Sequence, residues 1–221
     1  MDSTEQTTIR VLVVDDHLVV AESLAHALIE QPDIDVVGIA GSLAEARAQI
    51  NAKAPDIVLL DHALPDGEGA SAVGPLLADH PGIQIVILTG SVSDAVLVTA
   101  MEPGASGFLP KGGGLPELVD AVRSVAAGEI AVHPTLLRRL LQRVHGGDPP
   151  SLAHTLTPRE KEIFALVAEG LTNPAIAKRL YLSAHTVRNH VARLCAKLGA
   201  HSKLEALAIA VRDGLIDPPE R

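Results

Sequence analysis

The chain has 221 residues, of which 47% are hydrophobic, and its formal net charge is −9. Domains average about 100–200 residues, so this length fits one large domain or two small ones. The chain has a single cysteine, Cys195, which excludes an intrachain disulfide. No apolar run reaches the ~18 residues of a membrane helix, and the N-terminus lacks a basic start followed by an apolar stretch. We therefore expect a cytoplasmic protein without membrane contact.

Charged residues are unevenly distributed along the chain. Residues 1–150 carry 8 basic and 20 acidic side chains, whereas residues 151–221 carry 10 basic and 7 acidic ones. The stretch from Leu171 to Leu204 contains six Lys or Arg and no Asp or Glu. This asymmetry indicates a nucleic-acid partner for the C-terminal part, although chance scatter of surface charge explains it about as well.

Short apolar runs alternate with helix-forming stretches in the first half of the chain. We expect strands at 9–14, 35–39, 56–60, 83–89 and 106–110, and helices at 17–31, 43–53, 70–80, 93–102 and 115–128. Ser42 is the expected N-cap of the second helix, and Gly74 with Pro75 forms a weak spot in the third. Apolar strands that alternate with helices predict a doubly wound α/β fold, a parallel sheet covered on both faces.

The second half of the chain has a different pattern. Residues 129–154 read as a linker with room for one short helix at 133–144, and "HGGDPPS" (145–151) has linker composition. From Thr157 onward the chain is predicted to be helical, with a capping box in "TPRE" and later helix starts near Asn173, at Ser183 and in "SKLEALAIAVRDG". We expect one domain at 1–128 and a small four-helix, all-α domain at 155–221.

Polar side chains stand where the predicted strands end. Asp15 and Asp16 follow the first strand, Asp61 the third, Thr89 ends the fourth, and Lys111 follows the fifth. Parallel strands bring these ends to one edge, where open α/β sheets bind ligands. Clustered carboxylates suit Mg²⁺, one carboxylate can act as a nucleophile on a phosphoryl group, and Lys and Thr can hold its oxygens. Solvated or helix-capping acids are the alternative for Asp15 and Asp16 alone, but not for all five positions.

Two of the C-terminal helices meet at the short turn "YLS" in "LTNPAIAKRLYLSAHTVRNHVARLCAKLG". Their apolar positions form one stripe, and the opposite faces carry Lys178, Arg179, Arg188, Asn189, Arg193 and Lys197. This pattern predicts a helix-turn-helix, whose second helix enters the major groove of double-stranded DNA. Arg can bind guanine there and Asn can bind adenine. An amphipathic bundle with a solvated basic face is the alternative, and the caps, the turn and the acid-free stretch favour DNA binding.

The N-terminal motifs carry a family resemblance. Residues 9–128 resemble the receiver domain of two-component response regulators through "VLVVDDH", "DIVLLDHALPDGEG", "VILTG" and "GASGFLPK". The resemblance implies a flavodoxin-like five-stranded sheet and phosphorylation of Asp61 by a histidine kinase. It also implies Mg²⁺ ligands at Asp15, Asp16, Asp61 and the carbonyl of Ala63, phosphoryl-binding groups at Thr89 and Lys111, and an aromatic, Phe108, that turns inward on activation.

The chain departs from the receiver pattern near the expected phosphorylation site. Leu64 stands where methionine is common, and His62 stands where an apolar residue is commoner. We interpret His62 as an exposed or half-exposed strand-end residue and not as a metal ligand. Phe108 is explained equally well as a core residue. Pro103 and "KGGG" (111–114) alter loops of the switching face, but no reacting group is missing.

The C-terminal motifs carry a second resemblance. Residues 155–215 resemble the LuxR-type helix-turn-helix through "LTPREKEIFALVAEGLTNPAIAKRL" and "SAHTVRNHVARLCAKLG". Both domains together are similar to the NarL/FixJ family of response regulators. The resemblance implies that Thr186, Arg188 and Asn189 face the groove, that Arg193 and Lys197 lie near phosphates, and that a phosphorylated homodimer binds DNA. His185 and His190 are expected to cap or pack, and Cys195 to belong to the core.

The chain is thus predicted to be a transcription regulator switched by phosphorylation of Asp61, and not an enzyme. The alternative is an atypical regulator of the same fold that is controlled without phosphorylation. A phosphatase of the haloacid-dehalogenase type needs a second acid two residues after the first, where this chain has Ala63. A ligand-sensing LuxR-type regulator needs an aromatic-lined pocket, and aromatic residues make up 1% of the chain.

Overall fold

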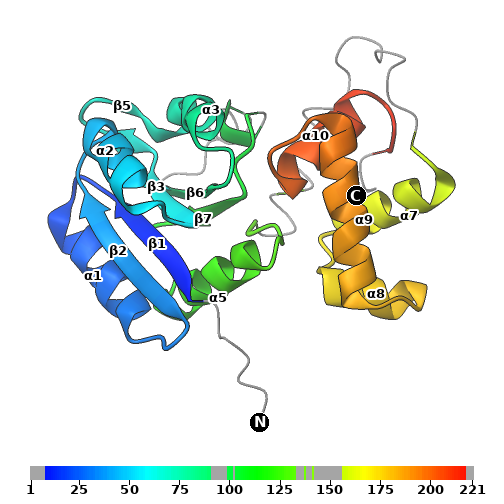
Figure 1. Cartoon of the computed structure of the whole chain (residues 1–221), viewed down its shortest axis with the longest axis horizontal. Helices are drawn as coiled ribbons and strands as arrows, with labels where there is room; N and C mark the ends of the chain where they lie inside the picture. Colours follow the sequence, from blue (N-terminus) through cyan, green and yellow to red (C-terminus); the bar gives the residue numbers. More distant parts are fainter. Residues whose placement is uncertain are drawn as a thin grey trace.

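A parallel sheet organises the N-terminal half of the chain. The computed structural model describes residues 8–90, 99–101, 103–132, 137, 141 and 156–217. The sheet contains β1 (Ile9–Val14), β2 (Ile34–Ala40), β3 (Ile57–Asp61), β6 (Gln84–Thr89) and β7 (Gly107–Pro110), in the order β2-β1-β3-β6-β7 (Figure 1). All four neighbouring pairs are parallel. The predicted doubly wound, five-stranded fold is confirmed, and its strand order reverses between β1 and β3, where such sheets bind ligands.

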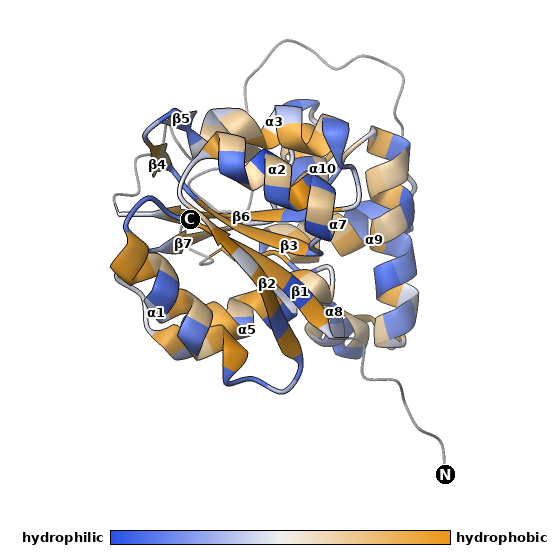
Figure 2. Ribbon diagram, turned by 60° about the vertical axis from the view of Figure 1, so that its left-hand side comes forward, coloured by the Kyte–Doolittle hydropathy of each residue, from blue (hydrophilic) through white to orange (hydrophobic). Residues whose placement is uncertain are grey.

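Helices cover both faces of the sheet, because successive strand residues point to opposite sides. On one face, Val11 and Val13 pack with α1 (Leu18–Ile29) and α5 (Leu115–Ala126). On the other face, Leu12 and Val14 pack with α2 (Leu43–Lys53) and α3 (Gly69–Asp79). Figure 2 shows apolar strands between these two layers. These four helices lie close to the bounds predicted for them. The helix α3 continues through Pro75, because its apolar residues are buried on both sides of the proline.

A short hairpin, not predicted from the sequence, follows β3. β4 (Ala63–Leu64) pairs with β5 (Gly67–Glu68) in antiparallel register across a two-residue turn. Asp66 in this turn accepts hydrogen bonds from the backbone N–H groups of Leu43 (2.8 Å) and Ala44 (2.9 Å). These bonds lower the pKa of Asp66, and they add a second cap to α2 beside Ser42, which accepts from Glu45 N. The loop after Asp61 is thereby fixed to α2.

The beginning of the predicted linker is part of the sheet edge. Phe108 N donates to Ala131 O (2.8 Å), and Ala131 N donates to Ser106 O (3.2 Å). Within the short helix predicted at 133–144, Leu137 and Leu141 are helical and buried, and its other residues lie outside the described part of the chain. The same applies to the helix predicted at 93–102, where only residues 99–101 are described, as helix.

The C-terminal half contains the four predicted helices, α7 (Pro158–Ala168), α8 (Asn173–Leu180), α9 (Ala184–Leu198) and α10 (Lys203–Arg212). The predicted capping box is present, since Thr157 N donates to Glu160 Oε2 and Glu160 N donates to Thr157 Oγ1. The apolar stripe of α8 and α9 is buried at Ile176, Ala177, Val187, Val191, Leu194 and Leu198. Across the described ranges, none of the helices combines the length and apolar character needed to span a membrane.

Ala54 gives a direct test of the backbone geometry at the end of α2. It adopts a left-handed conformation (φ 44°), which is unfavourable for any residue with a Cβ. We expect Ala54→Gly to raise the free energy of unfolding by about 0.5–1 kcal/mol, after allowance for the greater entropy of the unfolded chain. Ala48→Gly, at an exposed position within the same helix, should lower it by about 1 kcal/mol. Urea unfolding of both variants measures the two changes in free energy. If both substitutions changed the stability in the same direction, the left-handed conformation of Ala54 would be contradicted.

Candidate functional site

A charged cluster lies at the carboxyl ends of β1, β3 and β7. Asp15 follows β1, Asp61 ends β3, and Lys111 follows β7. Lys111 Nζ lies 2.7 Å from Asp15 Oδ2 and 2.7 Å from Asp61 Oδ2. The side chains of Asp15 and Asp61 are 0% and 3% exposed. The structure therefore brings together three of the predicted residues, and it sets two buried carboxylates against one ammonium group.

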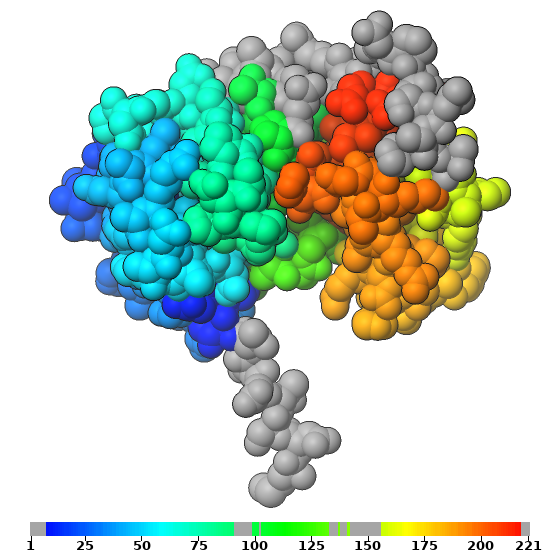
Figure 3. All heavy atoms as spheres, turned by 45° about the horizontal axis from the view of Figure 1, so that its top comes forward, coloured from blue at the N-terminus to red at the C-terminus, as the bar shows by residue number. Residues whose placement is uncertain are grey.

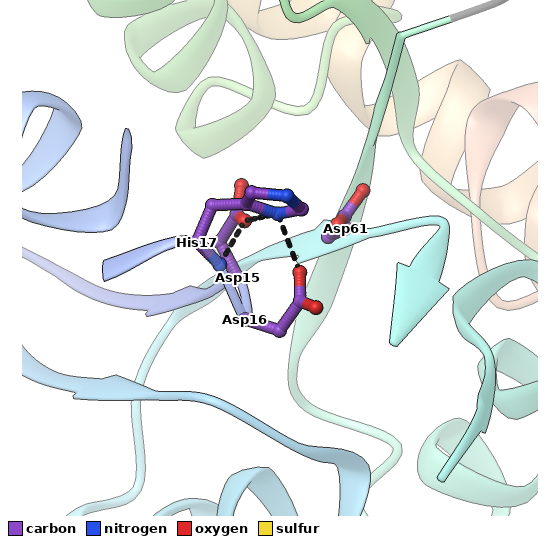
Figure 4. Close-up of side chains that lie close together, drawn as sticks. All are labelled: Asp15, Asp16, His17 and Asp61. Atoms are coloured by element: carbon purple, nitrogen blue, oxygen red, sulfur yellow. Dashed lines mark hydrogen bonds and ion pairs between the residues drawn. The ribbon is translucent and has the colours of Figure 1, made fainter. Parts of the chain in front are cut away.

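Asp16 and His17 complete the cluster at its solvent side (Figure 4). His17 Nδ1 lies 2.6 Å from Asp16 Oδ1, and His17 N donates to Asp15 Oδ1 at 2.9 Å. One ligand atom from each of Asp15, Asp16, His17 and Asp61 lies within 4.8 Å of the others. His17 directly follows the two acids but was not among the predicted site residues.

The donor set of this cluster fits Mg²⁺. Apart from the contact with Lys111, Asp15 Oδ2 and Asp61 Oδ2 have no hydrogen-bond partner in the described part of the chain. Partial burial lowers the pKa of Lys111, but the hydrogen bonds and charges of the two aspartates outweigh it and raise this pKa overall. Closely spaced carboxylate oxygens with unused acceptor capacity are the ligands that Mg²⁺ takes in proteins.

The remaining predicted residues of the N-terminal site surround this cluster. Thr89 is buried at the end of β6, and its carbonyl accepts from Lys111 N (2.8 Å). Phe108 is 2% exposed and belongs to the core. Ala63 is exposed in β4, and His62 is half-buried, as expected of a strand-end residue.

Gly69 allows the chain to return close to Asp61. Its N–H donates to His62 O (2.8 Å), and a Cβ at this position would overlap the backbone carbonyl of Asp61. Only glycine fits such a close approach without movement of the backbone. The start of α3 therefore helps to fix the position of Asp61.

A second candidate site is the helix-turn-helix formed by α8 and α9. Thr172 caps α8 and Ser183 caps α9 through their side-chain oxygens. Tyr181 makes the turn in a left-handed conformation (φ 56°), and its side chain is almost fully exposed. Two caps and a tight turn hold the two helices in fixed relation.

The predicted DNA-binding residues differ in how free their side chains are. Lys178, Arg188 and Arg193 are exposed and have no acidic partner among the described residues. Arg179 Nη1 lies 3.9 Å from Glu169 Oε2, and Lys197 Nζ lies 2.9 Å from Glu160 Oε2.

The polar residues at the start of α9 bond locally. Asn189 Nδ2 lies 3.1 Å from His185 Nε2, and Thr186 Oγ1 lies 2.8 Å from the capping hydroxyl of Ser183. His190 is half-buried, and Cys195 is half-buried rather than fully in the core. Burial raises the pKa of the Cys195 thiol to about 11.

Two protein-family models match the chain and cover both candidate sites. The response regulator receiver domain matches residues 11–123, and the luxR family of bacterial regulatory proteins matches residues 154–210. A receiver domain joined to a luxR-type domain defines the class of response regulators. The chain belongs to this family, in agreement with the fold and with both sets of motifs.

Relatives over the whole length lead to the same class. The DNA-binding transcriptional activator DevR/DosR of Mycobacterium tuberculosis is 39% identical over 215 residues, which cover 96% of this chain and 98% of that protein. The response regulator protein VraR of Staphylococcus aureus is 32% identical over 209 residues, 95% of this chain and 99% of that protein. The crystal structure of the response regulator ChrA, from a heme-sensing two-component system, has 33% identity and a TM-score of 0.50 over 95% of this chain and 100% of that one.

These findings confirm that the chain is a DNA-binding transcriptional response regulator of the two-component type. The alternative of control without phosphorylation gains no support from the matched families. The luxR-type match also includes α8 and α9, so the solvated basic bundle is the weaker interpretation of the C-terminal domain.

Removal of Lys111 tests the electrostatics of the acidic cluster. In buffer with EDTA, Lys111→Ala should lower the free energy of unfolding by about 2 kcal/mol, because two buried carboxylates lose their counter-charge. Millimolar Mg²⁺ should restore part of this loss, since the ion replaces the ammonium. Thermal unfolding with and without Mg²⁺ measures both effects.

Lys53→Ala is the matched control, because Lys53 on α2 faces no carboxylate in the described part of the chain. Neither its stability nor its response to Mg²⁺ should differ from wild type. If Mg²⁺ did not change the stability of the Lys111→Ala variant, a divalent-cation site at this cluster would be contradicted.

Proposed function

We propose that Asp61 accepts a phosphoryl group from a partner histidine kinase or a small phosphodonor. The observation that carries this proposal is the buried Asp61 carboxylate at the end of β3, 2.7 Å from the Lys111 ammonium. An oxygen of Asp61 attacks the phosphorus atom, the bond between phosphorus and the leaving group breaks, and the leaving group departs with the electron pair. The role is regulatory rather than enzymatic.

The residues around Asp61 then hold the product. Lys111 Nζ turns from the carboxylates to the phosphoryl oxygens, and the Thr89 hydroxyl donates to a second oxygen. Asp15, Asp16 and Asp61, with the carbonyl of Ala63, hold Mg²⁺, which offsets the negative charge that collects here. Phe108 lies on β7, two residues before the end of the strand that leads to Lys111, so a shift of Lys111 reaches it directly.

The output is binding of double-stranded DNA by α8 and α9. Thr186, Arg188 and Asn189 lie near the start of α9, the end that meets base edges in a helix-turn-helix. Lys178, Arg179, Arg193 and Lys197 supply positive charge for the phosphate backbone. A cytoplasmic homodimer, formed on phosphorylation, reads two half-sites about one helical turn apart.

Phosphorylation is tested by intact mass spectrometry after incubation with acetyl phosphate and Mg²⁺. Wild type should gain one phosphoryl group, and Asp61→Asn should gain none. Asp56→Asn is the matched control, because Asp56 directly precedes β3, far from Asp61 at its other end, and accepts a hydrogen bond from Arg10 N. Phosphorylation of the Asp61→Asn variant would contradict Asp61 as the phosphorylated residue. So would an equal loss of phosphorylation in the Asp61→Asn and Asp56→Asn variants.

DNA binding is tested by the salt dependence of duplex affinity. Arg193→Ala should weaken binding to all sequences alike and reduce the slope of log K against log [salt] by about 1. Arg212→Ala removes the same charge from α10, where Arg212 pairs with Asp213, and should leave the slope unchanged. Equal effects of both substitutions would assign the binding to net charge rather than to α9.

A further inference from the structure

One carboxylate fastens the tip of the β4–β5 hairpin to the start of α2. Asp66, in the two-residue turn of the hairpin, accepts from Leu43 N (2.8 Å) through Oδ1 and from Ala44 N (2.9 Å) through Oδ2. Hydrogen bonds from backbone N–H groups to an ionised carboxylate are stronger than those between neutral groups. Pro65, the other turn residue, has a fixed φ, which limits bending of the tip. Figure 3 shows the hairpin, drawn in cyan, at the surface and against α2.

Two different parts of the chain cap the start of α2. The first N–H groups of an α-helix have no partner within the helix. Asp66 accepts from the N–H groups of Leu43 and Ala44, and the Ser42 hydroxyl accepts from that of Glu45 (3.2 Å). Ser42 is a local cap, whereas Asp66 lies 23 residues from Leu43 in the sequence. The contact with Asp66 therefore links two elements, in addition to capping one of them.

The hairpin depends on contacts with the rest of the molecule for its position. β4 and β5 contain two residues each, and even an isolated hairpin with longer strands is marginally stable in water. Residue 63 and residues 65–68 are exposed, and Leu64 is half-buried against the core. The base of the hairpin is held by the hydrogen bond from Gly69 N to His62 O (2.8 Å). Its tip is held by Asp66.

Ala63 lies between these two attachment points, and its carbonyl is the proposed backbone ligand of Mg²⁺. Ala63 pairs with Glu68 across the hairpin, so a movement of the tip also moves the peptide group of Ala63. Mg²⁺ requires nearly ideal octahedral geometry with ligands at about 2.0–2.1 Å, so a small displacement of one ligand weakens binding. Removal of a group that orients a metal ligand typically lowers metal affinity by roughly 10–100-fold.

We propose that Asp66 is a positioning residue of the metal site, which holds the Ala63 carbonyl in place by binding the start of α2. The identity of the ion and of its ligand rests on the proposed function, whereas the attachment of the hairpin rests on the contacts of Asp66 alone. The simpler interpretation is that Asp66 only stabilises α2. Ser42 separates the two interpretations, because it caps the same helix start without belonging to the hairpin.

The first arm of the test measures the attachment in the absence of metal. Order parameters of the backbone N–H groups are obtained by ¹⁵N relaxation on the full-length protein in buffer with EDTA. In Asp66→Ala, the values for Ala63 and Glu68 should fall from about 0.85, which is typical of a rigid backbone, toward about 0.6. Ser42→Ala is the matched control and should leave both values unchanged. Urea unfolding shows that both variants are folded and that both have lost a cap of α2.

The second arm measures the affinity for metal. Mn²⁺ accepts the same kinds of ligand as Mg²⁺, and the electron paramagnetic resonance signal of free Mn²⁺ reports how much is bound. Competition with Mg²⁺ then gives the Kd for Mg²⁺. Asp66→Ala should raise this Kd roughly tenfold, and Ser42→Ala should leave it unchanged. Asp66→Asn should give a value between wild type and Asp66→Ala, because the amide retains one acceptor oxygen but not the charge.

The outcomes separate the positioning role from the proposed function. Unchanged order parameters, or an unchanged Kd for Mg²⁺, in folded Asp66→Ala overturn the positioning role. An equal rise of the Kd in Asp66→Ala and Ser42→Ala also overturns it, because the effect then arises from the stability of α2. If wild type binds neither ion, the proposed metal site itself fails and the positioning role fails with it. The order parameters still show in that case whether Asp66 holds the hairpin.

Discussion

The contact of the Lys111 ammonium with two buried carboxylates requires a particular strand order and register in the sheet. Asp15 and Asp61 end up side by side because β1 and β3 are parallel neighbours, and Lys111 reaches both from β7. Side chains alternate along a strand, so a register slip of one residue would turn Asp61 away from this edge. The same slip would exchange the faces on which Leu59 and Leu60 are buried. The same strand register is therefore required both for packing of the core and for the geometry of the site.

The chain beyond Asp61 is held as firmly as the strand before it. Asp66 ties the turn of the hairpin to the start of α2, and Gly69 brings α3 against the carbonyl of Asp61. The Asp66 carboxylate accepts from backbone N–H groups at the start of α2, and His62 O accepts from the N–H of Gly69 at the start of α3; such N–H groups need acceptors. The Asp61 carboxylate is therefore held by structured chain on both sides, and under the proposed function a change in its charge acts on α2 and α3 through these contacts.

The sequence predicts what is periodic or local, and it misses what depends on distant partners. The strands and the Thr157 capping box were predictable from spacing alone. The β4–β5 hairpin was not, because each strand has two residues and Asp66 is satisfied by α2. The basic stretch also overstated the free positive surface: Lys203 is buried against Glu129, 74 residues away, and Lys197 pairs with Glu160, 37 residues away.

The same charge asymmetry that suggested a nucleic-acid partner also explains why the two halves of the chain attract each other. The acidic N-terminal half is followed by Glu129, whose carboxylate lies 2.7 Å from the Lys203 ammonium of the basic domain. Both side chains are nearly inaccessible to solvent, so this pair is screened by salt much less than surface charges are. The charge difference between the two halves therefore acts within the molecule as well as on an external polyanion.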